Sequence, residues 1–147
     1  VLLIIKKHPV QKEWDIEEDA FENIRFVNQE MLDQKEIQLY ELISASDGLI
    51  SDYSSVAVDY MLLNRPLAFV LSDMQQYKET RGFVFENPQE YMPGEKIYDL
   101  KGLEEFAVHV SGEKDLYREE RRKLLPVMHQ MPVKENYSKA LAEFLKL

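Results

Sequence analysis

Four short runs rich in apolar residues alternate with helical patterns over the first 71 residues. The runs lie at residues 1–5, 24–27, 48–51 and 67–71. The first and last are apolar throughout, which is typical of parallel strands covered on both faces. Segments 36–45 and 55–63 carry apolar residues at helical spacing, and Asn64 before Pro66 is the expected C-terminal cap of the second. Strands that alternate with helices predict βαβ units.

Helical patterns dominate the rest of the chain. They lie at residues 103–110, 115–130 and 135–147, and a last short strand is expected at 96–98. The acidic segment 13–21 predicts a short exposed helix. A length of 147 residues suits a single domain with one core. The expected fold class is therefore α/β, with a Rossmann-like parallel sheet flanked by helices in one domain over residues 1–147.

Composition narrows the classes of partner. The apolar fraction of 45% and charged fraction of 31% fit a soluble globular protein. A net charge of −9 argues against a nucleic-acid partner and, weakly, against docking on an anionic membrane. There is no cysteine, no apolar run of spanning length, and no metal-ligand spacing among the three histidines. The chain begins within a strand pattern, its first residue is not Met, and it shows no signal peptide. We therefore expect it to be part of a longer protein.

The most informative segment is the polar turn between the strand at 48–51 and the next helix. Ser54 and Ser55 open that helix. The first N–H groups of a helix lack internal partners and favour anions, and one serine could cap the helix while the other binds a ligand oxygen. Asp59 is the lone carboxylate among apolar neighbours, for which we expect a ligand hydroxyl as partner. The segment predicts a phosphate or pyrophosphate site; the simpler interpretation is a capped helix.

Three basic side chains are further candidates. His8 follows the first strand, at the edge of the sheet where ligands of open α/β folds bind; the alternative is a histidine in a turn. Lys6 could point at the same anion or be a solvated strand-end lysine. Arg81, before Gly82, is either a loop arginine or a phosphate ligand. The basic residues of segment 118–123 alternate with glutamates, which favours a salt-bridged helix face.

Several motifs occur in one order along the chain. They are Lys6-x-His8-Pro9, segment 49–55 with Asp59, segment 63–66, Asp73 with Tyr77, Arg81-Gly82-Phe83, and Pro93-Gly94. This ordered set, from His8 to Gly94, resembles the carboxyl-terminal half of the CDP-glycerol glycerophosphotransferases, which prime or polymerise wall teichoic acid and related capsular polymers.

The resemblance implies the donor-binding half of a two-domain GT-B enzyme, whose amino-terminal acceptor domain is absent from this chain. Such enzymes are cytoplasmic and membrane-peripheral. They take glycerol phosphate from CDP-glycerol, or a related CDP-alditol, pass it to a polyol-phosphate acceptor and release CMP. No cofactor and no metal is implied.

Individual residues carry the resemblance further. His8 matches the family's essential histidine, Ser54 and Ser55 the serine pair near the donor phosphates, Asp59 the acid expected to bind ribose, and Arg81 the loop arginine. Segment 134–139 lacks the Asp-Gly of many members, which leaves glycerol and ribitol donors open. The alternatives are the donor half of a glycosyltransferase that uses a nucleotide sugar, and a non-catalytic nucleotide-binding domain.

Overall fold

The chain divides into two compact units, Val1–Ser46 and Asp47–Leu147. The structure, a computed structural model, describes residues 1–6, 21–129 and 136–146. His8 and almost all of the helix expected at 13–21 lie outside the described residues.

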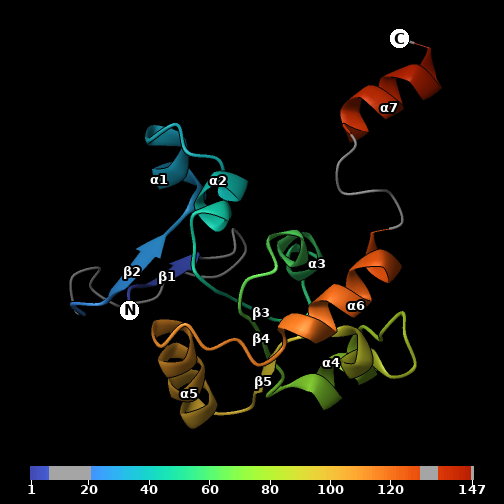
Figure 1. The fold of residues 1–147 in the computed structure, drawn as a ribbon. Coiled ribbons are helices and arrows are strands. Elements are labelled where there is room, and N and C mark those ends of the chain that lie inside the picture. Colours follow the sequence, from blue (N-terminus) through green and yellow to red (C-terminus); the bar gives the residue numbers. More distant parts are fainter. Residues whose placement is uncertain (7–20, 130–135, 147) are drawn as a thin grey trace. The chain divides into compact units, whose positions relative to one another are not determined.

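The first unit is built around one parallel strand pair (Figure 1). β1 (Leu3–Lys6) pairs with β2 (Ile24–Val27), with Leu3 opposite Ile24 and Lys6 opposite Val27. Two short helices follow, α1 (Gln29–Gln34) and α2 (Leu39–Ser44). The side chain of Asn28 accepts a hydrogen bond of 2.8 Å from the N–H of Met31 and thereby caps α1.

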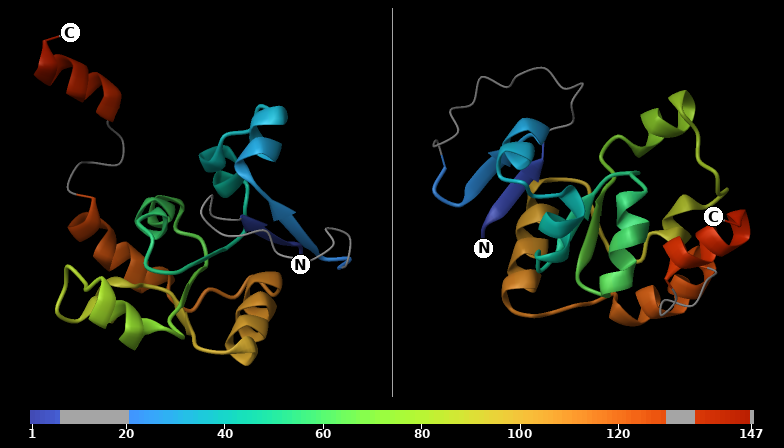
Figure 2. Two further views of the ribbon diagram at one scale, coloured as in Figure 1. Left: turned by 180° about the vertical axis from the view of Figure 1, so that it is seen from behind. Right: turned by 90° about the horizontal axis from the view of Figure 1, so that it is seen from above.

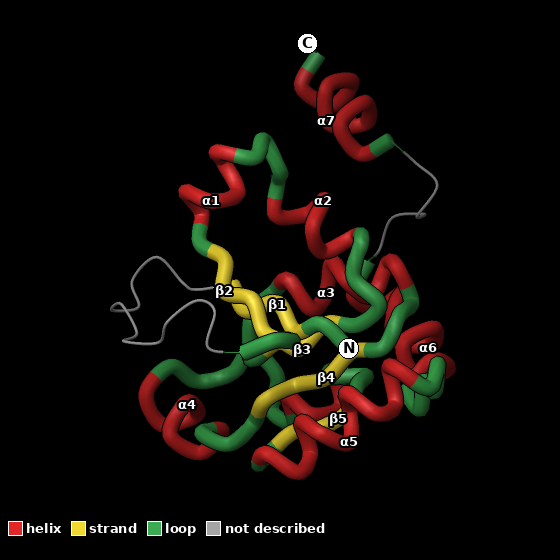
Figure 3. The backbone as a smooth tube through the Cα atoms, turned by 90° about the vertical axis from the view of Figure 1, so that its left-hand side faces the viewer, coloured by secondary structure: helices red, strands yellow, loops and turns green. Residues whose placement is uncertain are grey.

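The second unit contains a three-stranded parallel sheet in the order β3-β4-β5. Its strands are β3 (Leu49–Ser51), β4 (Leu67–Val70) and β5 (Glu95–Ile97), drawn in yellow in Figure 3. Ala68, Ile97 and Phe106 form the centre of the core and are almost completely buried. Gly94 approaches β4 so closely that a Cβ there would lie 2.2 Å from the carbonyl oxygen of Leu67. Only glycine fits at this position without a shift of the backbone.

Helices cover both faces of this sheet. α3 (Val56–Tyr60) packs against β3 and α5 (Leu100–Ser111) against β5, on opposite sides (Figure 2). The 3₁₀ turn η1 (Met61–Leu63) continues α3 and contacts α6 (Arg118–Met128). The remaining elements are α4 (Met74–Thr80), η2 (Pro88–Tyr91) and α7 (Tyr137–Leu145).

The α/β class and the parallel pairing of the strands are confirmed. β1 and β2 form the sheet of the first unit, and β3, β4 and β5 form the sheet of the second. Asn64 is the predicted cap, in the left-handed conformation with φ 49° and ψ 41°. Sequence patterns did not reveal α1, α4 or η2. Within residues 1–6, 21–129 and 136–146, no helix is long and apolar enough to cross a membrane.

Candidate functional site

The polar turn after β3 presents both serines at the surface. The carboxylate of Asp52 accepts a hydrogen bond of 2.9 Å from the N–H of Ser54, which folds the chain back toward α3. Ser55 stands at the N-cap position of α3, and within the described residues its side chain makes no capping hydrogen bond. The Ser55 hydroxyl is therefore not used in capping, contrary to the simpler interpretation of the sequence.

Asp59 is the fourth of the five residues of α3 and lies between the buried residues Ala57 and Tyr60. Its side chain is half-buried, and the residue has an interaction partner within the chain. Asp59 is thus not without a partner, and its partial burial alone does not call for a ligand. Its assignment to a donor ribose stays a prediction.

A cleft of about 510 Å³ opens beside this turn. It lies at the carboxyl ends of β3 and β4, where open α/β sheets bind ligands. Arg81 lines the cleft together with Asp52 and Tyr53, the two residues that precede Ser54. The structure therefore brings Arg81 to the same rim as the serine turn. The full lining is Asp52, Tyr53, Val70, Ser72, Asp73, Gln76, Tyr77, Thr80 and Arg81.

A cluster of aromatic side chains joins the serine turn to the arginine loop. Tyr53 donates a hydrogen bond of 2.8 Å to Asp73, the residue before α4. Its ring centroid lies 4.1 Å from that of Tyr77 and 5.3 Å from that of Phe83. Burial raises the pKa of the Tyr53 hydroxyl, and the bond to Asp73 raises it further. Tyr53 therefore stays a neutral donor that fixes one wall of the cleft.

Arg81 reaches the cleft because α4 ends beside it. The N–H groups of Arg81 and Gly82 both donate to the carbonyl oxygen of Tyr77, at 2.8 and 3.1 Å. Gly82 has a φ of 75°, in the left-handed region that a glycine adopts at little cost. The Arg81 side chain is exposed. The cleft thus combines a guanidinium with aromatic rings and carboxylates, and the exposed serines adjoin it.

The two remaining basic candidates, Lys6 and His8, belong to the first unit. Lys6 is the last residue of β1 and is half-buried. His8 lies outside the described residues. Both assignments stay predictions.

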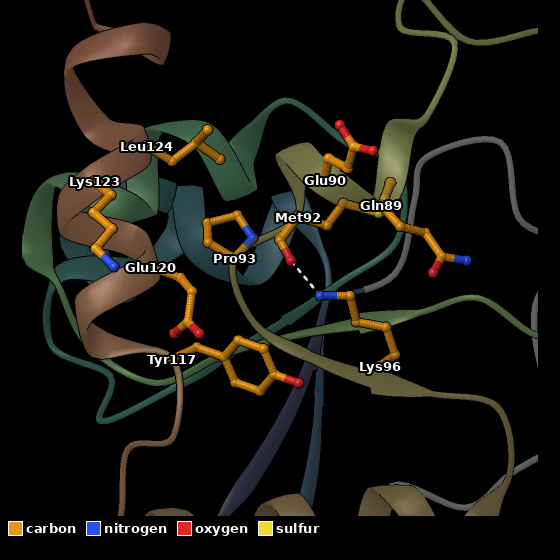
Figure 4. Close-up of a pocket in the computed structure, with 9 residues that line it drawn as sticks. All are labelled: Gln89, Glu90, Met92, Pro93, Lys96, Tyr117, Glu120, Lys123 and Leu124. Carbon is orange, nitrogen blue, oxygen red and sulfur yellow. Dashed lines mark hydrogen bonds between the residues drawn. The ribbon is translucent and has the colours of Figure 1, made fainter.

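A second pocket, of about 370 Å³, lies between η2 and α6 (Figure 4). Lys96 of β5 donates to the carbonyl oxygens of Met92 and Gly94, at 2.5 and 2.7 Å, and its Nζ lies 4.9 Å from the ring centroid of Tyr117. Burial lowers the pKa of Lys96, and the nearby Glu120 opposes that effect. Because its ammonium closes the turn before β5, Lys96 has a structural role. The described site residues do not line this pocket.

Sequence reasoning missed Tyr53 as part of the site, although it named Ser54 and Ser55, the two residues that follow it. The signal was present, because Tyr53 lies in motif segment 49–55 and its partners Asp73, Tyr77 and Phe83 belong to the other ordered motifs. Within residues 1–6, 21–129 and 136–146, no group of three or more His, Asp or Glu side chains is arranged to hold a metal ion.

Comparisons with known proteins identify the family. A sequence profile described as CDP-Glycerol:Poly(glycerophosphate) glycerophosphotransferase matches residues 1–139. A teichoic acid glycerol-phosphate primase of Bacillus subtilis (strain 168) is 33% identical over 103 residues, which are 69% of this chain and 25% of the relative. The corresponding primase of Bacillus spizizenii is 33% identical over 127 residues, 79% of this chain and 31% of the relative.

A teichoic acid ribitol-phosphate primase of Bacillus spizizenii is 42% identical over 65 residues, 44% of this chain and 16% of the relative. The chain spans between a quarter and a third of the length of the two glycerol-phosphate primases that it matches. Similarity thus extends to enzymes named for glycerol and for ribitol. The profile match over 139 consecutive residues shows that the chain belongs to the CDP-glycerol:poly(glycerophosphate) glycerophosphotransferase family.

Proposed function

We propose that this chain is the donor-binding part of a longer transferase. That enzyme moves glycerol phosphate from CDP-glycerol to an acceptor of teichoic-acid or capsule type and releases CMP. The observation that carries the proposal is the cleft at the carboxyl ends of β3 and β4, which Arg81 lines together with Asp52 and Tyr53, the residues next to the exposed Ser54 and Ser55. Family membership supports the class of reaction.

The site would bind a pyrophosphate mainly through short-range hydrogen bonds to its oxygens. α3 has five residues, so its dipole is small. Binding must therefore depend on serine hydroxyls, N–H groups at the start of the helix, and the Arg81 guanidinium, whose planar fork matches phosphate oxygens. The positive charge of Arg81 also offsets part of the negative charge of Asp52 and Asp73, which would otherwise repel an anion.

In the proposed reaction an acceptor hydroxyl attacks the phosphorus next to glycerol. A new P–O bond forms, the P–O bond to the CMP phosphate breaks, and the hydroxyl proton passes to a base outside this chain. The serines and Arg81 stabilise the charge that develops on departing CMP. His8, when protonated, would add a charge-assisted hydrogen bond, and Lys6 a further positive charge. Asp59 would accept from the ribose.

Two alternatives differ in the ligand. A glycosyltransferase half would prefer a nucleotide sugar, and a non-catalytic domain would bind nucleotide without supporting turnover. Similarity to a ribitol-phosphate primase keeps CDP-ribitol as a second donor of the same class. By resemblance to its family, we place the full-length enzyme at the inner face of the cell membrane, bound peripherally.

The test replaces both hydroxyls of the turn. Calorimetric titration of CDP-glycerol should show that Ser54→Ala with Ser55→Ala loses about 1–3 kcal/mol of binding free energy, because hydrogen bonds to a charged ligand disappear. The matched control is Ser111→Ala, which removes an exposed hydroxyl that donates to the carbonyl oxygen of Val108 in α5. Unchanged affinity in the double variant would mean that the serines do not contact the donor.

A further inference from the structure

His129, at the carboxyl end of α6, contacts α3, which lies far from it in the sequence. Nε2 of His129 lies 3.0 Å from the carbonyl oxygen of Val58, across 71 residues of chain. A carbonyl oxygen can only accept, so Nε2 must carry the proton and donate it. His129 is therefore held in one tautomer by the backbone of α3.

Val58 lies where α3 tightens into the 3₁₀ turn η1. The N–H of Met61 donates to the carbonyl oxygens of both Ala57 and Val58, as expected at a change from α to 3₁₀ geometry. His129 adds a second donor to the Val58 oxygen at this transition. α6 also packs against η1. The helix that begins at Ser55 is thus held from the side by α6 and from its far end by the left-handed cap at Asn64.

α6, at whose carboxyl end His129 lies, is held in place by a buried ion pair at its start. Arg121 is only 1% exposed and forms an ion pair with Asp115. Pro126 interrupts the last turn of α6, and the chain leaves the helix at His129 in an extended conformation with φ −122°. The N–H of His129 donates to the carbonyl oxygen of Leu125 at 2.8 Å. The backbone of His129 is therefore held by α6, and its imidazole is held by Val58.

We propose that His129 is a positioning residue for the donor phosphates. By holding the Val58 carbonyl, it sets the place of the first turn of α3 and so of the Ser54–Ser55 hydroxyls and N–H groups. Small displacements of such groups weaken binding strongly, since a phosphate site depends on donor geometry. The inference rests on the proposed function, and it adds a residue that lies outside the ordered motifs and the cleft.

The test compares two substitutions at one position. His129→Leu removes the donor, whereas His129→Gln keeps an amide N–H at about the reach of Nε2. Leucine should speed hydrogen exchange of the amides of α3 and weaken CDP-glycerol binding, each by about threefold to tenfold, the range expected for one hydrogen bond. Glutamine should restore most of both. The matched control is His109→Leu, which breaks the contact of His109 with Glu95, 3.0 Å away, and should leave both readouts unchanged.

Equal affinity and equal exchange in His129→Leu and the wild type would overturn the inference, as would a folded His129→Gln that rescues neither. Hydrogen exchange needs no ligand, so it tests the bracing of α3 even if CDP-glycerol fails to bind, which would refute the proposed function instead. A further measurement covers a leucine variant that does not fold. In the wild type, CDP-glycerol should slow exchange of the His129 Nε2 proton seen by NMR, and an unaffected proton would contradict the coupling.

Discussion

Removing the hydroxyl of Tyr53 is the sharpest perturbation that the candidate cleft offers. Tyr53→Phe keeps the ring and its contacts with Tyr77 and Phe83, at 4.1 and 5.3 Å between centroids, and deletes only the hydrogen bond to Asp73. A hydrogen bond to a charged acceptor contributes about 1.5–3 kcal/mol. Because Tyr53 is only half-buried, we expect a loss near the lower end, about 1–2 kcal/mol, at pH 7.

The contribution of the Tyr53 hydroxyl to stability should decrease at high pH. In the unfolded chain the Tyr53 hydroxyl has a pKa of about 10. In the fold, burial and the contact with Asp73 raise the pKa above that value. Above pH ~10 the unfolded state loses this proton first, so the stability that the proton provides is complete below pH ~10 and declines as the pH rises. The phenylalanine variant lacks this decline.

The assay is urea unfolding of both proteins between pH 7 and pH 11. The difference in unfolding free energy between wild type and Tyr53→Phe should be constant up to about pH 9.5 and shrink above it. Tyr77→Phe is the matched control, because it removes a hydroxyl from the same cluster and leaves the Tyr53–Asp73 bond in place. A difference that stays constant to pH 11 would refute the argument, because the Tyr53 proton would then not be held by the fold.

Four further substitutions test the scaffold. Gly94→Ala should cost about 2 kcal/mol or more of unfolding free energy, because the added Cβ would lie 2.2 Å from a β4 carbonyl oxygen; Gly102→Ala, with no neighbour nearer than 3.5 Å, is its control in thermal unfolding, and equal losses would contradict the close approach. Asp115→Ala should cost about 3–5 kcal/mol. Arg121→Met should cost less, because it removes the buried charge together with Nε and Nη1, which lack hydrogen-bond partners within the described part of the chain; the reverse order in denaturant unfolding would refute this. Burial lowers the pKa of Lys96 in the fold below its value in the unfolded chain, ~10.5, so the free energy of unfolding should rise as the pH increases from the lowered pKa to ~10.5. Lys96→Met should abolish that rise. Identical pH profiles of unfolding free energy in the wild type and the variant would contradict this prediction.

Sequence patterns predicted the strands because these are short, apolar and bounded by turn residues. Segment 24–27 matches β2, and Asn64 takes the left-handed cap that its place before Pro66 indicated. α1 and α4 were missed because each carries only two apolar or aromatic residues, whereas α2, of similar length, carries four. Helices this short depend on caps and tertiary contacts more than on periodicity.

The sequence predicted those candidate site residues that belong to motifs occurring in a fixed order along the chain. The position of Arg81 beside the serine turn follows from the ordered motifs, whereas the bond between Tyr53 and Asp73 joins residues 20 apart that no spacing rule connects. The arginine-rich segment gave a mixed result. Arg122 and Glu119 form the expected exposed ion pair at 2.8 Å, but Arg121 beside them is buried against Asp115. One turn of a charged helix does not reveal which arginine faces inward, because the covering residues come from elsewhere in the chain.

The most direct test of the donor assignment is a competition experiment on the isotope-labelled chain. CDP-glycerol, CDP-ribitol, CMP and a UDP-sugar would be titrated in turn while the amide resonances of Ser54, Ser55 and Arg81 are followed by NMR. We predict that the cytidine ligands shift these three amides first and that CDP-glycerol or CDP-ribitol displaces any bound UDP-sugar. Equal or tighter binding of the UDP-sugar, or shifts confined to other parts of the chain, would contradict the assignment of this cleft to a CDP-alditol.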